Sequence, residues 1–151
     1  MTSVLTPKKE PRSLAPSPAR PAPMLDEISR RTVVVLAVSW IVLNAIGVAL
    51  EPELPADVAV PGYVVALAWA WLTLAVATGA GLMLRMRFAL PASLGGAIVF
   101  VAASIACPVS GHHPIGMWWI GQLFCALALV GVSVWALVRE HGPADASADT
   151  A

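Results

Sequence analysis

The chain has 151 residues, of which 58% are hydrophobic and only 12% are charged. An ordinary soluble domain is about 45–50% apolar and about 25% charged. This composition excludes a disordered, collagen-like or disulfide-rich secreted protein, and it favours an integral membrane protein with little mass outside the bilayer. Nine Lys and Arg residues balance nine Asp and Glu residues. Without a basic stripe that contains interleaved aromatic residues, nothing indicates a nucleic-acid partner.

Both ends of the chain are polar. Residues 1–31 hold six prolines among Ser, Ala and basic residues. The fixed φ angle and the missing N–H group of proline oppose a helix, so we expect a disordered cytoplasmic tail. Residues 139–151 form a second, short polar tail. The membrane domain is therefore predicted to cover residues 32–138.

Four apolar runs follow one another in this domain, at residues 32–50, 62–84, 88–107 and 115–138. Each run has the length needed to cross the ~30 Å hydrocarbon core of a bilayer. The runs must be helical because lipid offers no hydrogen-bond partner to an open backbone. The connections are short, so neighbouring helices run antiparallel. The sequence predicts an all-α integral membrane protein, with four transmembrane helices in an up-down bundle.

The basic residues predict the orientation of this bundle. All nine lie before residue 32, at Arg85 and Arg87, or at Arg139, and the other two loops have none. Four spans place these three segments on the same side, which the positive-inside rule makes cytoplasmic. We therefore expect a multi-pass protein of the plasma (inner) membrane with both termini in the cytoplasm. The two remaining loops, 51–61 and 108–114, face outward together.

The residues best suited to metal binding or other chemistry lie in or beside the two outward loops. One holds an acidic group, Glu51, Glu53 and Asp57, and the other combines His112 and His113 with the flanking Cys107 and Met117. Thiolate, imidazole and thioether groups are ligands suited to copper or zinc. The same composition is also typical of an ordinary loop between two helices, in which a neutral histidine caps a helix or bonds a carbonyl group. A third interpretation is that His112 and His113 form a proton- or pH-sensing pair, and all three stay open.

Asn44 and Gln122 are the strongest polar residues inside the predicted spans. They lie about 9 Å and about 12 Å below the outer ends of their helices, at 1.5 Å per residue. A hydrogen bond between them would fix which helices touch, and a polar lining for a substrate is the alternative. Small residues at helical spacing, such as Ala92 and Gly96, predict close helix packing. We expect the mid-membrane Trp40 to pack against a neighbouring helix.

The apolar runs hold no Asp, Glu, Lys or Arg, which argues against an ion-coupled pump. We see no catalytic triad, nucleotide-binding loop or zincin motif, so an enzyme is not expected. The leading interpretation is a small non-catalytic accessory subunit that packs in the lipid bilayer against a larger membrane protein or a second copy. Two alternatives are an outward-facing copper- or zinc-binding protein that uses the His112/His113 loop, and a small-molecule carrier that uses Asn44 and Gln122.

Overall fold

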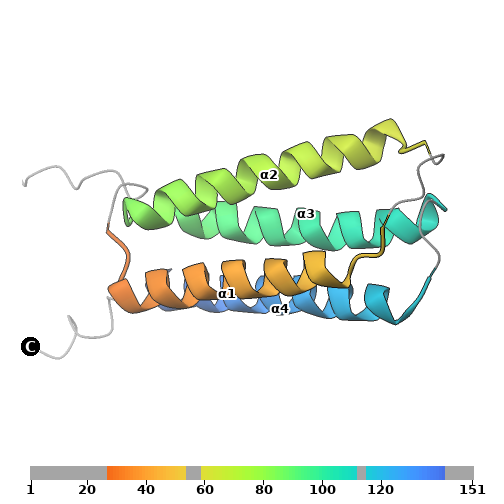
Figure 1. The fold of residues 1–151 in the computed structure, drawn as a ribbon. Coiled ribbons are helices and arrows are strands. Elements are labelled where there is room, and N and C mark those ends of the chain that lie inside the picture. The colour runs from red at the N-terminus through yellow and green to blue at the C-terminus, as the bar shows by residue number, and fades with distance from the viewer. Residues whose placement is uncertain (1–26, 54–58, 112–114, 142–151) are drawn as a thin grey trace, which may run out of the picture.

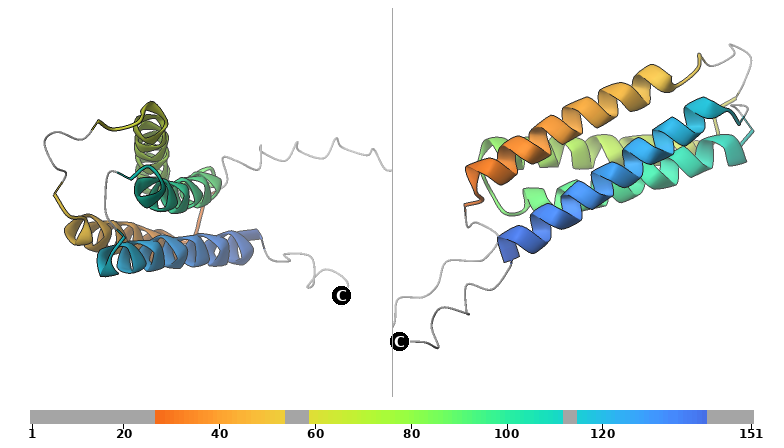
Figure 2. Two further views of the ribbon diagram at one scale, coloured as in Figure 1. Left: turned by 90° about the vertical axis from the view of Figure 1, so that its right-hand side faces the viewer. Right: turned by 90° about the horizontal axis from the view of Figure 1, so that it is seen from below.

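The computed structural model describes residues 27–53, 59–111 and 115–141, whose regular secondary structure is helical. Helices α1 (Arg30–Leu50), α2 (Gly62–Met83), α3 (Ala89–Val109) and α4 (Met117–His141) lie side by side in an elongated bundle (Figure 1). Each is long and apolar enough to cross a membrane, which confirms the prediction of four such helices. In Figure 2, α2 packs on α3, α3 packs on α4, and α4 packs on α1.

Helices α1, α3 and α4 extend beyond the apolar runs that predict them. α1 begins at Arg30, and Ile28 just before it is fully buried, so residues 27–31 of the expected tail belong to the bundle. α4 continues to His141 because polar side chains stabilise its last turn. The Arg139 guanidinium lies 5.3 Å from the centre of the Trp135 ring, within the range of a cation–π contact.

The turn between α2 and α3 contains an unusual backbone conformation. Arg85 has φ 55°, in the left-handed region that a helix C-terminus usually assigns to glycine. The Met86 N–H donates to the Gly81 carbonyl at 2.8 Å and the Arg85 N–H donates to the Leu82 carbonyl at 3.2 Å, as in a Schellman motif. A residue with a Cβ in this region costs about 1–2 kcal/mol. The arginine side chain must therefore contribute something that glycine lacks.

That contribution is a polar cluster, here called the clasp, formed by Glu27, Ile28, Ser29, Arg85 and Glu140. Arg85 forms an ion pair with Glu27 and donates to the Ile28 carbonyl at 3.0 Å, while the Ile28 N–H donates to the Arg85 carbonyl at 2.9 Å. The Ser29 hydroxyl donates to the Glu140 carboxylate at 2.7 Å. The clasp therefore ties the start of α1 to the α2–α3 turn and to the end of α4.

A buried chain of hydrogen bonds joins three helices in the middle of the bundle. The Trp40 indole N–H on α1 donates to the Ser93 hydroxyl on α3 at 2.8 Å. Ser93 and Ser133 on α4 share a hydrogen bond of 2.7 Å, and the Ser133 hydroxyl also bonds the Leu129 carbonyl at 2.8 Å. Since these groups have no water to bond in a bilayer, the chain favours one relative placement of α1, α3 and α4.

Gly96 on α3 allows Trp40 to reach this position. A Cβ atom at Gly96 would lie 2.8 Å from the Trp40 ring and 3.3 Å from the Leu74 Cβ. The ring cannot easily move away because its N–H is bonded to Ser93. The small residue that the sequence analysis assigned to close packing therefore lies where α1, α2 and α3 meet.

We expect Gly96→Ala to lower the free energy of unfolding by about 1–3 kcal/mol, because the added methyl group overpacks the site. Gly131→Ala on α4 is the matched control, since a Cβ there meets nothing within 4 Å. It should leave stability unchanged or raise it by up to about 1 kcal/mol through helix propensity. Thermal unfolding of the two variants in the same detergent measures the difference. Equal stability would show that Trp40 is free to move.

Candidate functional site

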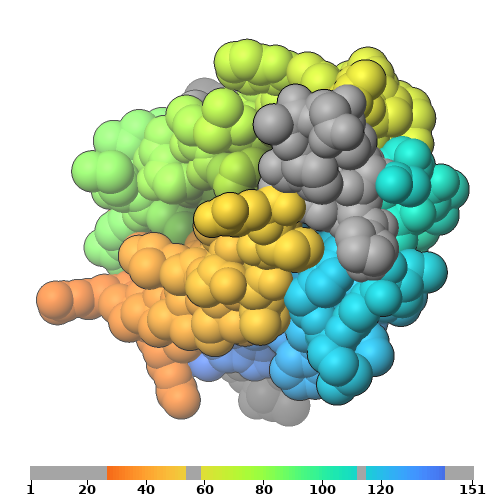
Figure 3. Space-filling model, turned by 45° about the vertical axis from the view of Figure 1, so that its right-hand side comes forward, coloured from red at the N-terminus to blue at the C-terminus, as the bar shows by residue number. Residues whose placement is uncertain are grey.

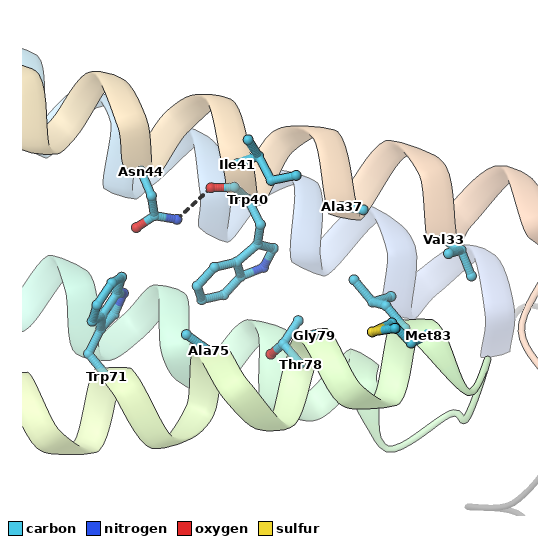
Figure 4. A pocket seen from close by; sticks show the side chains of 11 residues that line it. Val33, Ala37, Trp40, Ile41, Asn44, Trp71, Ala75, Thr78, Gly79 and Met83 are labelled. Carbon is cyan, nitrogen blue, oxygen red and sulfur yellow. Dashed lines mark hydrogen bonds between the residues drawn. The ribbon is translucent and has the colours of Figure 1, made fainter.

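A cleft separates α1 from α2, although these helices follow each other in the chain. The two helices contact each other much less than the other neighbouring pairs. The space between them has a volume of about 440 Å³. The space-filling view shows the orange and yellow surface of α1 beside the green surface of α2 (Figure 3), and Figure 4 shows the residues that line the cleft.

The walls of the cleft are mainly apolar. Ala37 on α1 lies opposite Ala75 and Gly79 on α2 (Figure 4). Ile41, near the middle of α1, also lines the cleft and is 71% exposed, so this wall reaches the outer surface of the bundle. In a membrane this surface meets the hydrocarbon tails of lipids. The cleft therefore opens toward the bilayer rather than toward the other two helices.

A second cavity, of about 210 Å³, continues the cleft away from the clasp. Asn44 and Trp71 line both cavities and lie on opposite walls (Figure 4). The second cavity, here called the outer pocket, is more polar than the first, here called the inner pocket. Its polar lining comes from all four helices and from the residue after α1, and it includes Asn44, Glu51, Trp71, Ser104, Cys107 and Gln122.

Three buried polar atoms along the cleft lack a hydrogen-bond partner. They are Gln122 Oε1 and Trp71 Nε1 at the outer pocket and Thr78 Oγ1 at the inner pocket. Gln122 is 6% exposed and Thr78 is 1% exposed. A buried polar atom without a partner costs about 1–3 kcal/mol, so each such atom needs an explanation. Gln122 Oε1 and Trp71 Nε1 belong to residues that line one pocket, so a single explanation can apply to these two atoms.

Asn44 and Gln122 line the same outer pocket, but no hydrogen bond joins them in the part of the chain that the structure describes. The Asn44 side-chain amide donates to the Trp40 carbonyl of its own helix at 2.7 Å. This bond uses one of the two N–H groups of the amide and holds the Asn44 side chain against its own helix. Asn44 and Gln122 therefore line one cavity, in agreement with the similar depth inferred from the sequence, but they are not bonded to each other.

The part of α3 that lines the outer pocket ends next to a proline. Pro108 lies inside the last turn of this helix. Proline has no N–H group, so the carbonyl of Ser104, four residues earlier, loses its helical partner. The Trp119 indole N–H of α4 donates to this carbonyl at 2.8 Å instead. Because Trp119 satisfies the carbonyl, α3 continues to Val109, two residues beyond the predicted apolar run.

The residues of the expected metal loop are only partly described. His112, His113 and Asp57 lie outside the described residues. Cys107 lines the outer pocket, whereas the Met117 side chain is 80% exposed. Glu51 also lines the outer pocket, and Glu53 is exposed. Within residues 27–53, 59–111 and 115–141, no three His, Cys, Asp or Glu side chains form a group that could hold a metal ion.

The sequence analysis missed the cleft itself. The residues that line the inner pocket repeat the same spacing on both helices, at positions 33, 37, 40, 41 and 44 of α1 and at 71, 75, 78, 79 and 82 of α2. This spacing marks one face of a helix. The spacing could have identified these two helix faces, but it does not show that a space remains between them.

The chain matches no protein family, and no curated protein or solved structure is significantly similar to it.

We expect Trp119→Phe to lower the free energy of unfolding by about 1–3 kcal/mol, because it leaves the Ser104 carbonyl buried without a partner. Pro108→Ala restores an N–H group in α3, so Trp119→Phe should cost less in that background. A double-mutant cycle of thermal unfolding in detergent measures this coupling. Equal costs in the two backgrounds would show that the Trp119 bond does not compensate for Pro108.

Proposed function

We propose that this chain is a small, non-catalytic membrane protein that binds an amphipathic small molecule in the cleft between α1 and α2. The observation that carries this proposal is an apolar cleft whose buried polar atoms Gln122 Oε1, Trp71 Nε1 and Thr78 Oγ1 have no partner. This proposal retains the binding step of the small-molecule carrier considered in the sequence analysis and leaves out the transport step.

The size of the cleft supports a small molecule as its occupant. Ligand pockets commonly measure about 300–1,000 Å³, and the inner pocket alone has a volume of about 440 Å³. An α-helix with its side chains is about 10–12 Å across, which requires a much wider groove. Because Ile41 lines the cleft near the middle of α1 and is 71% exposed, the cleft opens at the depth of the lipid chains, and a molecule dissolved in the bilayer can enter from the side.

A second role, as an accessory subunit of a larger membrane complex, is supported by the unequal burial of the helices. A smaller share of α1 and α2 than of α4 is buried inside the bundle. A face that its own chain leaves uncovered is available to another membrane protein or to a second copy of this chain. The two roles use different surfaces, since the cleft lies between α1 and α2 and a partner would cover their outer faces.

We also propose that the protein is inserted in the plasma (inner) membrane with both termini in the cytoplasm. Arg85, Arg87 and Arg139 support this orientation because they lie at the end of the bundle where α2 ends, α3 begins and α4 ends (Figure 1). The described residues at the opposite end contain no Lys or Arg. The positive-inside rule therefore favours the clasp end as the cytoplasmic one.

Reporter fusions test this orientation. Green fluorescent protein fused after residue 151 should fluoresce, and alkaline phosphatase fused there should be inactive, because the C-terminus is expected in the cytoplasm. The matched control places each reporter after residue 53 and should give the reverse result. An active phosphatase at the C-terminus would contradict the proposed orientation.

Purification from native membranes in a gentle detergent tests the binding function. We expect organic extraction of the wild-type protein to release an amphipathic molecule at about one per chain. Gly79→Leu should abolish this retention, because a Cβ atom at Gly79 meets no atom within 4 Å and Gly79 lines the inner pocket, which the leucine side chain is expected to occupy. Gly131→Leu, at a residue of α4 outside the cleft, is the matched control and should retain the molecule.

Two other results of the same purification bear on the proposals. Equal retention by the wild type and by Gly79→Leu, or an empty wild type, would contradict binding in the cleft. A larger membrane protein recovered at a fixed ratio would support the accessory-subunit role, and recovery of the chain alone would count against it.

A further inference from the structure

We propose that the ligand is a single-tailed amphiphile with an uncharged hydroxyl head, such as a monoacylglycerol or a long-chain alcohol. Its head lies in the outer pocket between Gln122 and Trp71, and its tail lies along the inner pocket. This inference rests on the proposed binding function and adds the chemical class and the orientation of the ligand.

The two unpartnered atoms at the outer pocket define the head. Gln122 Oε1 is an acceptor and needs a donor, while the Trp71 indole N–H is a donor and needs an acceptor. Both residues line the outer pocket. A hydroxyl group provides a donor and an acceptor together, so one hydroxyl or a glycerol pair satisfies both residues. A ketone or quinone oxygen only accepts and would leave Gln122 Oε1 without a partner.

The Gln122 side chain of α4 lies at the contact with the neighbouring helix α1. Its Cγ lies 3.9 Å from the place where a Cβ of Gly47 on α1 would be. The Phe100 ring lies 3.0 Å from the same place and stands tilted against the Trp71 ring, with 6.3 Å between the ring centres. Phe100 and Trp71 thus lie beside the amide, and the space for a head next to it is the outer pocket of about 210 Å³.

Charge and shape disfavour two other classes of amphiphile, those with an anionic head and those with two chains. The Glu51 carboxyl lines the outer pocket, so an anionic head would meet a like charge there. The cleft extends from Val33 to Val48, about 22 Å along α1 at 1.5 Å per residue. It has a volume of about 440 Å³ at the inner pocket, and this long, narrow shape suits one extended chain rather than the two chains of a phospholipid.

Binding of radiolabelled 1-oleoylglycerol to the full chain in detergent micelles tests this class. We expect saturable binding at one site per chain, and oleate, with the same tail and an anionic head, should compete at least about tenfold more weakly. Gln122→Met keeps the shape of the side chain but removes its acceptor, and it should weaken binding about tenfold. Thr73→Val is the matched control, because Thr73 lies on the exposed face of α2 and bonds its own helix; its affinity should equal that of the wild type.

The stability of the ligand-free variant separates a ligand contact from a packing role. If Gln122 serves the ligand, Gln122→Met should be at least as stable as the wild type, because it removes a buried amide oxygen that has no partner. A lower melting temperature for Gln122→Met would overturn the inference and assign the amide to helix packing. Equal binding of oleate, or unchanged binding by Gln122→Met, would overturn it as well.

Failure of this inference is distinguishable from failure of the proposed function. If the wild type retains a native molecule that Gly79→Leu loses, while 1-oleoylglycerol does not bind, then the cleft binds a ligand of another class and only the further inference is wrong. If neither a native molecule nor 1-oleoylglycerol binds, both are wrong.

Discussion

The hydrocarbon core of a membrane offers no hydrogen-bond partner, and the structure depends on how each polar group inside the bundle meets this constraint. The Trp40 indole is bonded to Ser93, and Ser93 is bonded to Ser133, so one chain of contacts satisfies three side chains and aligns three helices. The Ser104 carbonyl, which Pro108 deprives of its helical partner, accepts from Trp119 instead. The unpaired atoms of Trp71, Thr78 and Gln122 are exceptions to this pairing along the cleft between α1 and α2, and a further unpaired atom, Arg85 Nε, lies at the clasp.

The cleft results from the positions of bulky and small residues along α1 and α2. At the clasp end, Glu27 and Ile28 bond to Arg85, which holds the start of α1 against the end of the α2–α3 turn. Further along, the Trp40 ring packs into Gly96 of α3 and the Trp71 ring lies against Phe100, so neither tryptophan fills the space between α1 and α2. Between these rings and the clasp, Ala37 on α1 lies opposite Ala75 and Gly79 on α2, and these small side chains do not fill the space between the helices. The left-handed backbone at Arg85 is tolerated because its side chain secures the clasp.

Sequence patterns predicted the parts of this molecule that depend on local properties. The length and apolarity of each run predicted four helices that could cross a membrane, because every helix carries that information within itself. Asn44 and Gln122 were placed at similar depth and do line one pocket. Their direct bond was not found, because the Asn44 amide is bonded to the Trp40 carbonyl within α1. The cleft depends on which helices become neighbours and how closely they approach, and a sequence spacing that marks one helix face does not contain that information.

The chemistry of the surrounding bilayer bears on how an occupant would lie in the cleft. An apolar space that opens to lipid is exposed to hydrocarbon chains at the concentration of the membrane itself, whereas water would find few polar partners in the inner pocket. A chain that enters there can lie either way, with its head toward the clasp or toward Gln122. The outer pocket holds an unpaired donor on Trp71 and an unpaired acceptor on Gln122, while the inner pocket holds the single hydroxyl of Thr78. Two complementary partners outweigh one, so the polar group of an amphiphile is more stable at the outer pocket.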